Sequence, residues 1–233
     1  MIGRRSFLRI LAAAAGGAAG PSQATTAADW ALALSVGSRF TSAGIPAQAF
    51  NLPTTDMMPT LSAGDVLLGD LRGAGKMPKR SDVISFIHKD GSHFIKRVVG
   101  LPGDRIAFRN WQLYLNGEAV PTEDKGMIPV EMFGIKQYFR RSLESPKGSD
   151  PYLVGRGTVL FDNEEKYGEL DEVRVPDGRI FVVGDNRSNS LDSRFESMPP
   201  VHVADVLSRI VFRLRPNAGW LVPESSVEGL AAR

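Results

Sequence analysis

Short runs of apolar residues, each closed by turn residues, dominate the chain from residue 51 onward. They are rich in β-branched and aromatic side chains, and turn signals such as Gly64-Asp65 and Gly100-Leu-Pro-Gly103 bound them, as is typical of strands. The runs are Val66–Leu68, Val83–Ile87, Phe94–Val99, Arg179–Gly184 and Leu207–Leu214. We expect the last of them to close the sheet. The pattern predicts a mainly β fold with a largely antiparallel core.

The chain between the third and fourth runs is more polar. Residues 105–115 form one strand-like stretch, and Asn116-Gly117 directly after it is the strongest hairpin dipeptide in the sequence. Residues 121–178 carry scattered Gly, Pro and acidic residues, which favour hairpins and loops. We therefore expect a β-rich core at 47–105 and 179–215, with a smaller β lobe inserted at 106–178. Residues 25–46 are expected to be an amphipathic or irregular lead-in, and 216–233 a C-terminal tail.

The first 24 residues have the pattern of an export signal. A basic head with Arg4, Arg5 and Arg9 precedes the weakly apolar run Leu11–Gly20, and the pair Arg4-Arg5 before Ser-Phe-Leu resembles a twin-arginine signal. Ser22-Gln-Ala24 supplies small residues of the A-x-A cleavage type. The alternative is a weak, uncleaved membrane anchor, but a spanning helix needs about 20 apolar residues and this run is short and glycine-containing. We favour a cleaved signal over an anchor, and either reading places the remaining chain outside the cytoplasm.

Composition and charge exclude several classes of function. The sequence has no cysteine and only three histidines, so disulfides, thiolate metal sites and a cysteine nucleophile are excluded, and a histidine zinc site is disfavoured. The formal net charge is +2, but beyond residue 24 the chain carries 25 basic and 26 acidic residues, a net of −1. No clustered basic excess remains, so we expect no nucleic-acid binding.

Three segments of the chain carry the candidate chemistry. They are Pro53-Thr-Thr-Asp-Met-Met-Pro-Thr-Leu61, Lys96-Arg-Val-Val-Gly-Leu-Pro-Gly-Asp104 and Gly184-Asp-Asn-Arg-Ser-Asn-Ser-Leu-Asp-Ser-Arg194. In this order they resemble the conserved boxes of type I signal peptidases, the membrane-associated serine endopeptidases that remove signal peptides from exported proteins. The second and third boxes are complete, and Arg80–Ile84 matches the strand entry before the second. The resemblance covers about residues 47–215, and three long boxes in order are a specific signal.

The resemblance implies a β-rich catalytic core with an inserted smaller β lobe, in agreement with the pattern above. It also implies a serine nucleophile with a lysine general base, a variant of the serine–histidine–aspartate arrangement. Lys96 matches the general base, and apolar neighbours such as Phe94 and Val98 would favour its neutral amine. Thr54 matches a hydroxyl that donates to the oxyanion hole, and Ser190 matches the hydroxyl that orients the lysine. Supporting residues matched in the third box are Asp185, Asn186, Asp192 and Arg194, the last two as an ion pair.

The resemblance further implies no cofactor. Its expected partners are the C-terminal regions of signal peptides on exported proteins, together with a membrane surface. The corresponding location is the periplasmic side of the bacterial inner membrane.

Asp56 departs from the family pattern, because the nucleophile position matches a serine. A carboxylate has no hydroxyl to deprotonate, and its charge beside Lys96 favours the ammonium form. We therefore expect an Asp56–Lys96 ion pair instead of a serine–lysine dyad. Thr54 or Thr55 could instead act as nucleophile, but a shift of one residue in an extended segment turns the side chain to the other face. An Asp56–Asp192 pair activating water is a second alternative, and a strain-specific change or sequence error is a third.

Two functions follow from these observations. The first is a serine endopeptidase of the signal peptidase I type, impaired or inactivated by Asp56. The second is a catalytically inactive homologue that binds signal-peptide ends, or a protein partner, by strand addition beside residues 53–58. An exported β protein whose sequence is decaying is a third reading, and the well-preserved boxes argue against it.

Overall fold

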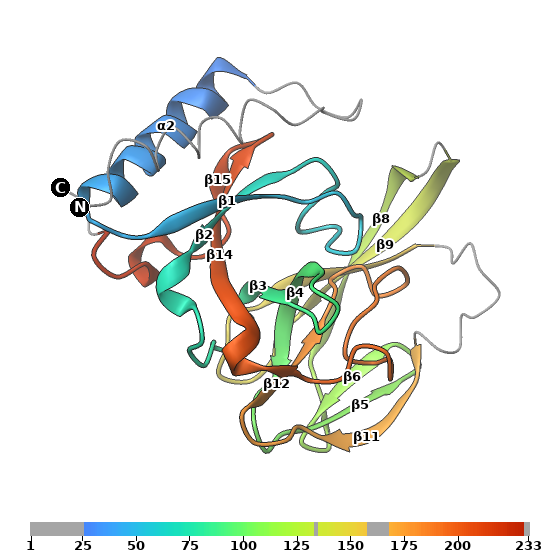
Figure 1. Ribbon diagram of the computed structural model, residues 1–233. Helices are drawn as coiled ribbons and strands as arrows, with labels where there is room; N and C mark the ends of the chain where they lie inside the picture. Colours follow the sequence, from blue (N-terminus) through green and yellow to red (C-terminus); the bar gives the residue numbers. More distant parts are fainter. Residues whose placement is uncertain (1–25, 133–134, 158–167, 231–233) are drawn as a thin grey trace.

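Figure 1 shows the computed structural model, which describes residues 26–132, 135–157 and 168–230. The expected export signal at residues 1–24 lies outside these ranges. The described chain consists mainly of antiparallel strands, as expected, with one long helix at its N-terminal end. No helix in the described part of the chain is long and apolar enough to cross a membrane.

The helix α2 (Ala27–Ser42) forms most of the lead-in, which is therefore amphipathic and regular. Thr26 begins it with a capping box, in which its hydroxyl accepts from the Asp29 N–H and the Asp29 carboxylate accepts from the Thr26 N–H. Its buried face includes Ala33, Val36 and Phe40, which pack on the end of the main sheet. Leu32 and Leu34 on the other face remain exposed.

The main sheet has the strand order β1-β2-β14-β3-β4-β12-β13, with β15 paired to β14. Its strands are β1 (Ala47–Asn51), β2 (Val66–Asp70), β3 (Val83–Ile87), β4 (His93–Gly100), β12 (Arg179–Val183), β13 (Val201–His202), β14 (Val206–Arg215) and β15 (Gly219–Trp220). All neighbouring strands in it are antiparallel. The five apolar runs are thus confirmed as strands. The 3₁₀ turns η1 (Leu71–Gly73), η2 (Val203–Asp205) and η3 (Glu224–Ser226) lie between or after them.

Two expectations about the C-terminal part were wrong. The strand containing Leu207–Leu214 does not close the sheet, because β14 lies inside it between β2 and β3. Residues 216–233 are also not a simple tail, since β15 pairs with β14 and both Val227 and Leu230 are buried against α2. The sequence pattern predicted β14 itself, but not its neighbours in the sheet or its pairing with β15.

The inserted lobe contains two small sheets in the described residues. One has the order β11-β5-β6-β7 and the other β10-β9-β8. Their strands are β5 (Arg105–Arg109), β6 (Gln112–Leu115), β7 (Glu118–Ala119), β8 (Thr122–Met132), β9 (Ile135–Glu144), β10 (Tyr152–Gly157) and β11 (Leu170–Arg174). The first of these strands, β5, begins at Arg105. Figure 1 shows β8 and β9 as a long hairpin that projects from the rest of the molecule.

Two consecutive turns shape the start of the lobe. Asn116 and Gly117 have φ of 55° and 85°, so the expected hairpin turn is confirmed. The stretch 105–115 is not one strand, however, because Asn110 and Trp111 also have positive φ, 48° and 70°, and turn the chain between β5 and β6. Trp111 is held in this unfavourable conformation by its N–H, which donates to Gly168 O at 3.0 Å.

The first motif segment, Pro53–Leu61, packs on its own cluster of buried apolar side chains. Met57 and Leu61 are completely buried and pack with Leu67, Ile95 and Ile210. Leu52 N–H donates to Asp65 O and Gly64 N–H donates to Leu52 O, so the ends of the segment are closed on one another. This packing fixes the loop that carries Thr54 and Asp56.

Candidate active site

Lys96 lies on β4, beside β3, where it pairs with Ile84. Its side chain is completely buried, and its Nζ lies 5.4 Å from the centre of the Phe94 ring. Nζ forms an ion pair with Asp56 Oδ2. The Asp56 side chain is 14% exposed, so this pair has the lysine inside and the carboxylate at the edge. The structure thus contains the ion pair that the sequence led us to expect.

The second carboxylate oxygen of Asp56 is also bound. Thr54 Oγ1 donates a hydrogen bond to Asp56 Oδ1 at 2.5 Å. The carboxylate therefore lies between a lysine amine and a threonine hydroxyl, with one oxygen facing each. The resemblance assigns Lys96 to the general base and Thr54 to the oxyanion hole. The Asp56 side chain binds both of them.

Thr55 contacts the third segment. Its Oγ1 accepts from Asn189 Nδ2 at 2.8 Å, and its carbonyl accepts from Asn186 Nδ2 at 3.0 Å. The Asn186 N–H also donates to the Asp56 carbonyl at 3.0 Å. Asn186 therefore holds the backbone of the first segment, a contact that its position in the motif did not specify.

Asp192 and Arg194 form a completely buried bidentate ion pair, with two N–O distances of 2.8 Å. Asp192 Oδ2 also accepts from the Gly184 N–H at 2.9 Å. Burial alone would raise the pKa of Asp192, but the Arg194 charge and these hydrogen bonds outweigh it, so the pKa lies below its usual range. Asp192 makes no ion pair or hydrogen bond with Asp56 in the described chain, which leaves the alternative of a water-activating carboxylate pair without support.

Ser190 is buried, but its hydroxyl makes no hydrogen bond of normal geometry with a described residue. It faces Asp192, where it contributes to lowering the carboxyl pKa, and it packs against Gly184. A Cβ at position 184 would lie 2.1 Å from Ser190 Oγ and 2.5 Å from the Asp56 carbonyl, so only glycine fits there. The expected contact between Ser190 and Lys96 is therefore not made.

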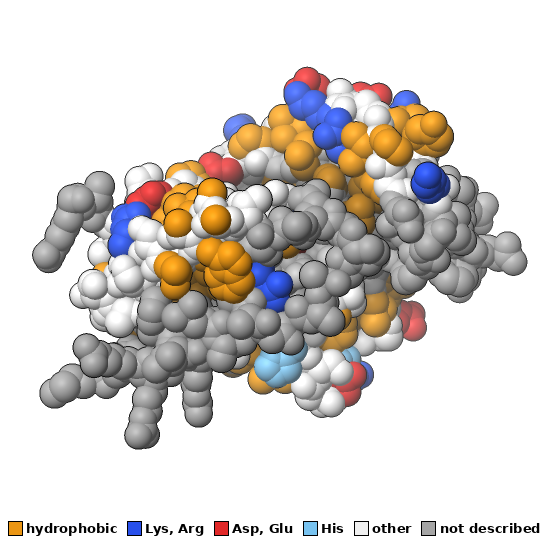
Figure 2. Space-filling model, turned by 90° about the horizontal axis from the view of Figure 1, so that it is seen from above, with side chains coloured by type: hydrophobic (Ala, Val, Ile, Leu, Met, Phe, Trp, Pro, Cys, Tyr) orange, Lys and Arg blue, Asp and Glu red, His pale blue; other side chains and the backbone are white. Residues whose placement is uncertain are grey.

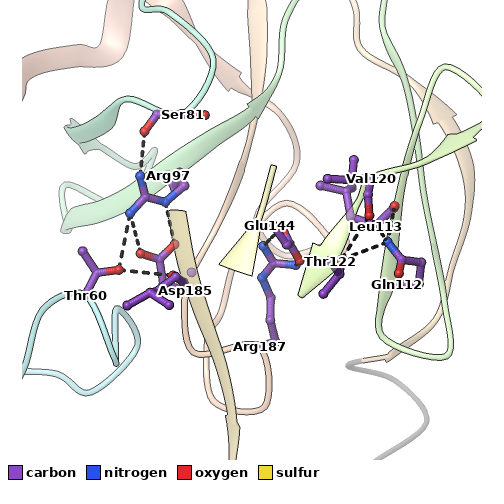
Figure 3. Close-up of polar contacts among 12 residues, drawn as sticks. Thr60, Ser81, Arg97, Gln112, Leu113, Val120, Thr122, Glu144, Asp185 and Arg187 are labelled. Atoms are coloured by element: carbon purple, nitrogen blue, oxygen red, sulfur yellow. Dashed lines mark hydrogen bonds and ion pairs between the residues drawn. The ribbon is translucent and has the colours of Figure 1, made fainter. Parts of the chain in front are cut away.

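Two buried arginines near the third segment were not singled out by sequence reasoning (Figure 3). Arg97 binds Asp185 through two bonds of 2.7 and 2.6 Å and donates to Ser81 O. Arg187 binds Glu144 through two bonds of 2.7 Å, with both side chains under 5% exposed. Arg97 and Arg187 belong to the second and third boxes, so their positions were a usable signal. Glu144 lies outside all three boxes, and nothing local marks it.

Contacts of Arg97 and Arg187 join the lobe to the core. Tyr152 on β10 lies under the Arg97 guanidinium, 4.4 Å from its ring centre, and burial raises the pKa of this tyrosine far above its usual range. The Gly155 N–H donates to Asp185 O, and the Arg187 N–H donates to Gly155 O. Burial by itself would lower the pKa of Arg97, but the nearby Asp185 charge and hydrogen bonds outweigh it. The pKa is therefore raised, and the guanidinium stays charged.

Among the described residues, no cluster of three or more His, Cys, Asp or Glu side chains could hold a metal ion. The groups that meet at Asp56 are an amine, a hydroxyl and a carboxylate.

A family model described as "Signal peptidase, peptidase S26" matches residues 26–215, most of the chain. The chain belongs to the signal peptidase S26 family. It is 36% identical over 161 residues to a signal peptidase I of Bacillus caldolyticus, a match covering 69% of this chain and 75% of that protein. It is 30% identical over 173 residues to a signal peptidase I of Pseudomonas aeruginosa, covering 66% and 57% of the two chains.

Coverage differs among the relatives of this S26 family member. A signal peptidase I of Rickettsia bellii matches at 28% identity over 172 residues, 64% of this chain and 59% of that protein. The chain thus spans less than two thirds of the Rickettsia and Pseudomonas relatives. A solved signal peptidase I from Enterococcus faecalis V583 gives a TM-score of 0.33 at 24% identity, covering 57% of this chain and 97% of that one. The family assignment rests on the sequence matches.

Proposed function

We propose that this protein is a non-cleaving or strongly impaired relative of signal peptidase I, which binds the C-terminal region of signal peptides on exported proteins. Family membership supports the substrate class. One observation carries the loss of activity: the Asp56 carboxylate engages both Lys96 and Thr54. This proposal includes the assignment of Asp56 to the serine position, Lys96 to the general base and Thr54 to the oxyanion hole.

Acyl transfer in such a site needs three things at once. A hydroxyl must attack the peptide carbonyl, a neutral amine must take its proton, and a donor must stabilise the oxyanion that forms. A carboxylate supplies no proton, and its attack on a peptide would form an anhydride while expelling an amine. The Asp56 carboxylate also holds the Lys96 side chain in an ion pair. Asp56 thereby removes the nucleophile and occupies the remaining two groups.

The segment that carries Asp56 is held in place by burial and by hydrogen bonds. The first segment is anchored by buried Met57 and Leu61 and tied to the third by Asn186. Residues 53–58 contain bends and a turn, in which the Met58 N–H donates to Thr55 O. They therefore offer no strand edge of the kind expected from the sequence, and an extended peptide would lie against this loop. Ser190, Asp185, Asp192 and Arg194 then act as residues that keep the third segment in position, with Asp185 and Asp192 each held by an arginine.

A single mixture tests binding and cleavage together. The purified protein is titrated with a labelled peptide containing a signal-peptide C-terminal region that ends in A-x-A and the first residues after it. We expect saturable binding with no cleavage product. A peptide with both alanines replaced by arginine is the matched control. It should bind at least about tenfold more weakly if the proposed site selects small side chains at these two positions. Cleavage of the first peptide, or equal binding of both, would contradict the proposal.

We further propose that the protein works outside the cytoplasm, on the periplasmic side of the bacterial inner membrane and in contact with the membrane surface. The basic, weakly apolar pattern of residues 1–24 supports export. Figure 2 shows hydrophobic side chains beside Lys and Arg, with Asp and Glu also present, on the face seen there.

A further inference from the structure

We propose that Asp56 and Lys96 react with one another in the folded protein and form an intramolecular isopeptide bond. In this reaction the Lys96 amine is the nucleophile and the Asp56 carboxyl group acylates it, once per molecule. The inference rests on the same assignment of Lys96 and Thr54 as the proposed function. It adds a covalent cross-link between the first motif segment and strand β4.

The first argument is the environment of the amine. The Lys96 side chain has no exposed surface, and in the described chain its only hydrogen bond is to Asp56. The aromatic ring of Phe94 and the buried strand β4 surround it. Removing an ammonium and a carboxylate from water is strongly unfavourable for each ion. Conversion of the pair into a neutral amide removes both charges from this site, whereas in water hydration would favour the ions.

The second argument is geometry. Because Nζ contacts one carboxylate oxygen of Asp56, it lies next to the carboxyl carbon without any diffusion or reorientation. The other oxygen accepts a hydrogen bond from Thr54 at 2.5 Å. When the amine adds to the carboxyl carbon, negative charge develops on that oxygen, and the Thr54 hydroxyl already donates to it. A site of the acyl-transfer type thus has a carbonyl, a nucleophile and an oxyanion donor within one cluster of three side chains.

The atoms of the reaction balance without any co-reactant. The Nζ–Cγ bond forms and the bond from Cγ to Oδ2, the oxygen facing the amine, breaks. Within the ion pair, one ammonium proton first passes to Asp56 Oδ2, which gives a neutral amine and a carboxylic acid. The amine then attacks Cγ, a second N–H proton joins Oδ2 as it leaves as water, and one N–H remains in the amide. Asp56 is 14% exposed, so the released water has a path out of the site.

The chain offers an internal control. Lys125 and Glu123 also form an ion pair, with a distance of 2.6 Å, but their side chains are 36% and 65% exposed. Water solvates both ions there, and no hydroxyl donates to the carboxylate among the described contacts. We expect this pair to stay uncoupled in the same molecules in which Asp56 and Lys96 are joined.

Intact-mass spectrometry of the purified, denatured full chain tests the inference. The expected mass is about 18 Da below the value calculated for its N-terminus, the mass of one lost water. Tryptic digestion should yield residues 40–72 joined to residues 90–97, since acylated Lys96 is no longer a cleavage site. Lys125 should still be cleaved. A denaturation transition measured on the same preparation shows that the material tested was folded.

Three variants sharpen the result. Lys96→Arg keeps the positive charge but lacks the amine, and Asp56→Ser lacks the acyl group, so each should have its own calculated mass. Thr54→Val removes the oxyanion donor and should lower the cross-linked fraction at a given time after folding. Folded parent protein with the full calculated mass would overturn the inference, and so would a mass loss that persists in Lys96→Arg or maps elsewhere. None of these outcomes depends on peptide cleavage, so the proposed function stands or falls separately.

Discussion

At the scale of single residues, the ion pairs of this protein differ mainly in the solvent exposure of their side chains. Arg187 and Glu144 are 4% and 3% exposed, whereas Lys125 and Glu123 lie at the surface. Removing one partner of a buried pair leaves the other charge without compensation, and this costs far more than the pair itself contributes. Exposed pairs contribute little because water replaces the lost partner.

Glu144→Gln should therefore lower the free energy of unfolding by about 3–5 kcal/mol, because it leaves the buried Arg187 charge unpaired. Glu123→Gln, the matched exposed control, should change it by less than about 1 kcal/mol. Urea denaturation of both variants beside the parent measures the difference. Equal effects of the two substitutions would show that the Arg187–Glu144 pair is not a buried structural pair in solution.

The residue-scale site was predictable only in part. The Asp56–Lys96 ion pair followed from charge and motif position, and the buried Asp192–Arg194 pair from the third box. Ser190 was expected to bond with Lys96 and does not, because its hydroxyl faces Gly184 and Asp192 instead. Glu144 could not be found, since it lies 43 residues from Arg187 and pairs with it only through the tertiary fold.

At the scale of elements, α2 is attached to the sheet by one face. Phe40 is 1% exposed and packs with residues of β14 and the C-terminal segment, while Leu32 on the same helix is 41% exposed. Helices in proteins gain most of their stability from such packing. The C-terminal residues Val227 and Leu230 cover the same helix, so both ends of the described chain meet there.

Phe40→Ala should lower the free energy of unfolding by about 3–5 kcal/mol through lost burial and the cavity left behind. Leu32→Ala should stay within about 0.5 kcal/mol of the parent, because an exposed leucine loses little and alanine favours helix. Thermal denaturation followed by circular dichroism measures both. A small effect of Phe40→Ala would mean that α2 is not docked on the sheet.

The strands were predictable from local pattern, whereas their order was not. Each apolar run became a strand because burial favours β-branched residues at those positions. The placement of β14 between β2 and β3 depends on long-range pairing, which the pattern along one strand does not contain. The turn at Asn110-Trp111 was missed because tryptophan rarely adopts positive φ without a tertiary contact, here the one with Gly168.

At the scale of the whole molecule, the core and the inserted lobe meet through the Gly155 hydrogen bonds and the Arg187–Glu144 pair. The lobe therefore supports the candidate site in addition to extending the fold. The sequence analysis expected such a division from the polar, turn-rich stretch after residue 105. It did not predict the contacts that join them.

Export makes a separate prediction about the whole chain. If residues 1–24 are a cleaved signal, N-terminal sequencing of protein recovered from the periplasm should begin at or near residue 25. Replacing Arg4 and Arg5 together by lysine should block this processing if the signal is of the twin-arginine type. Recovery of an intact Met1 in the membrane fraction would instead favour the anchor.

The central claim is that Asp56 removes cleavage from a site that is otherwise arranged for it, and restoring the serine tests this most directly. The parent, Asp56→Ser and Asp56→Ser combined with Lys96→Ala are assayed in parallel on a signal-peptide substrate. We predict no measurable cleavage by the parent and none by the double variant. Asp56→Ser should exceed both by at least about a thousandfold, since losing one member of a catalytic unit costs that much or more. Cleavage by the parent at a rate comparable to Asp56→Ser would contradict the account.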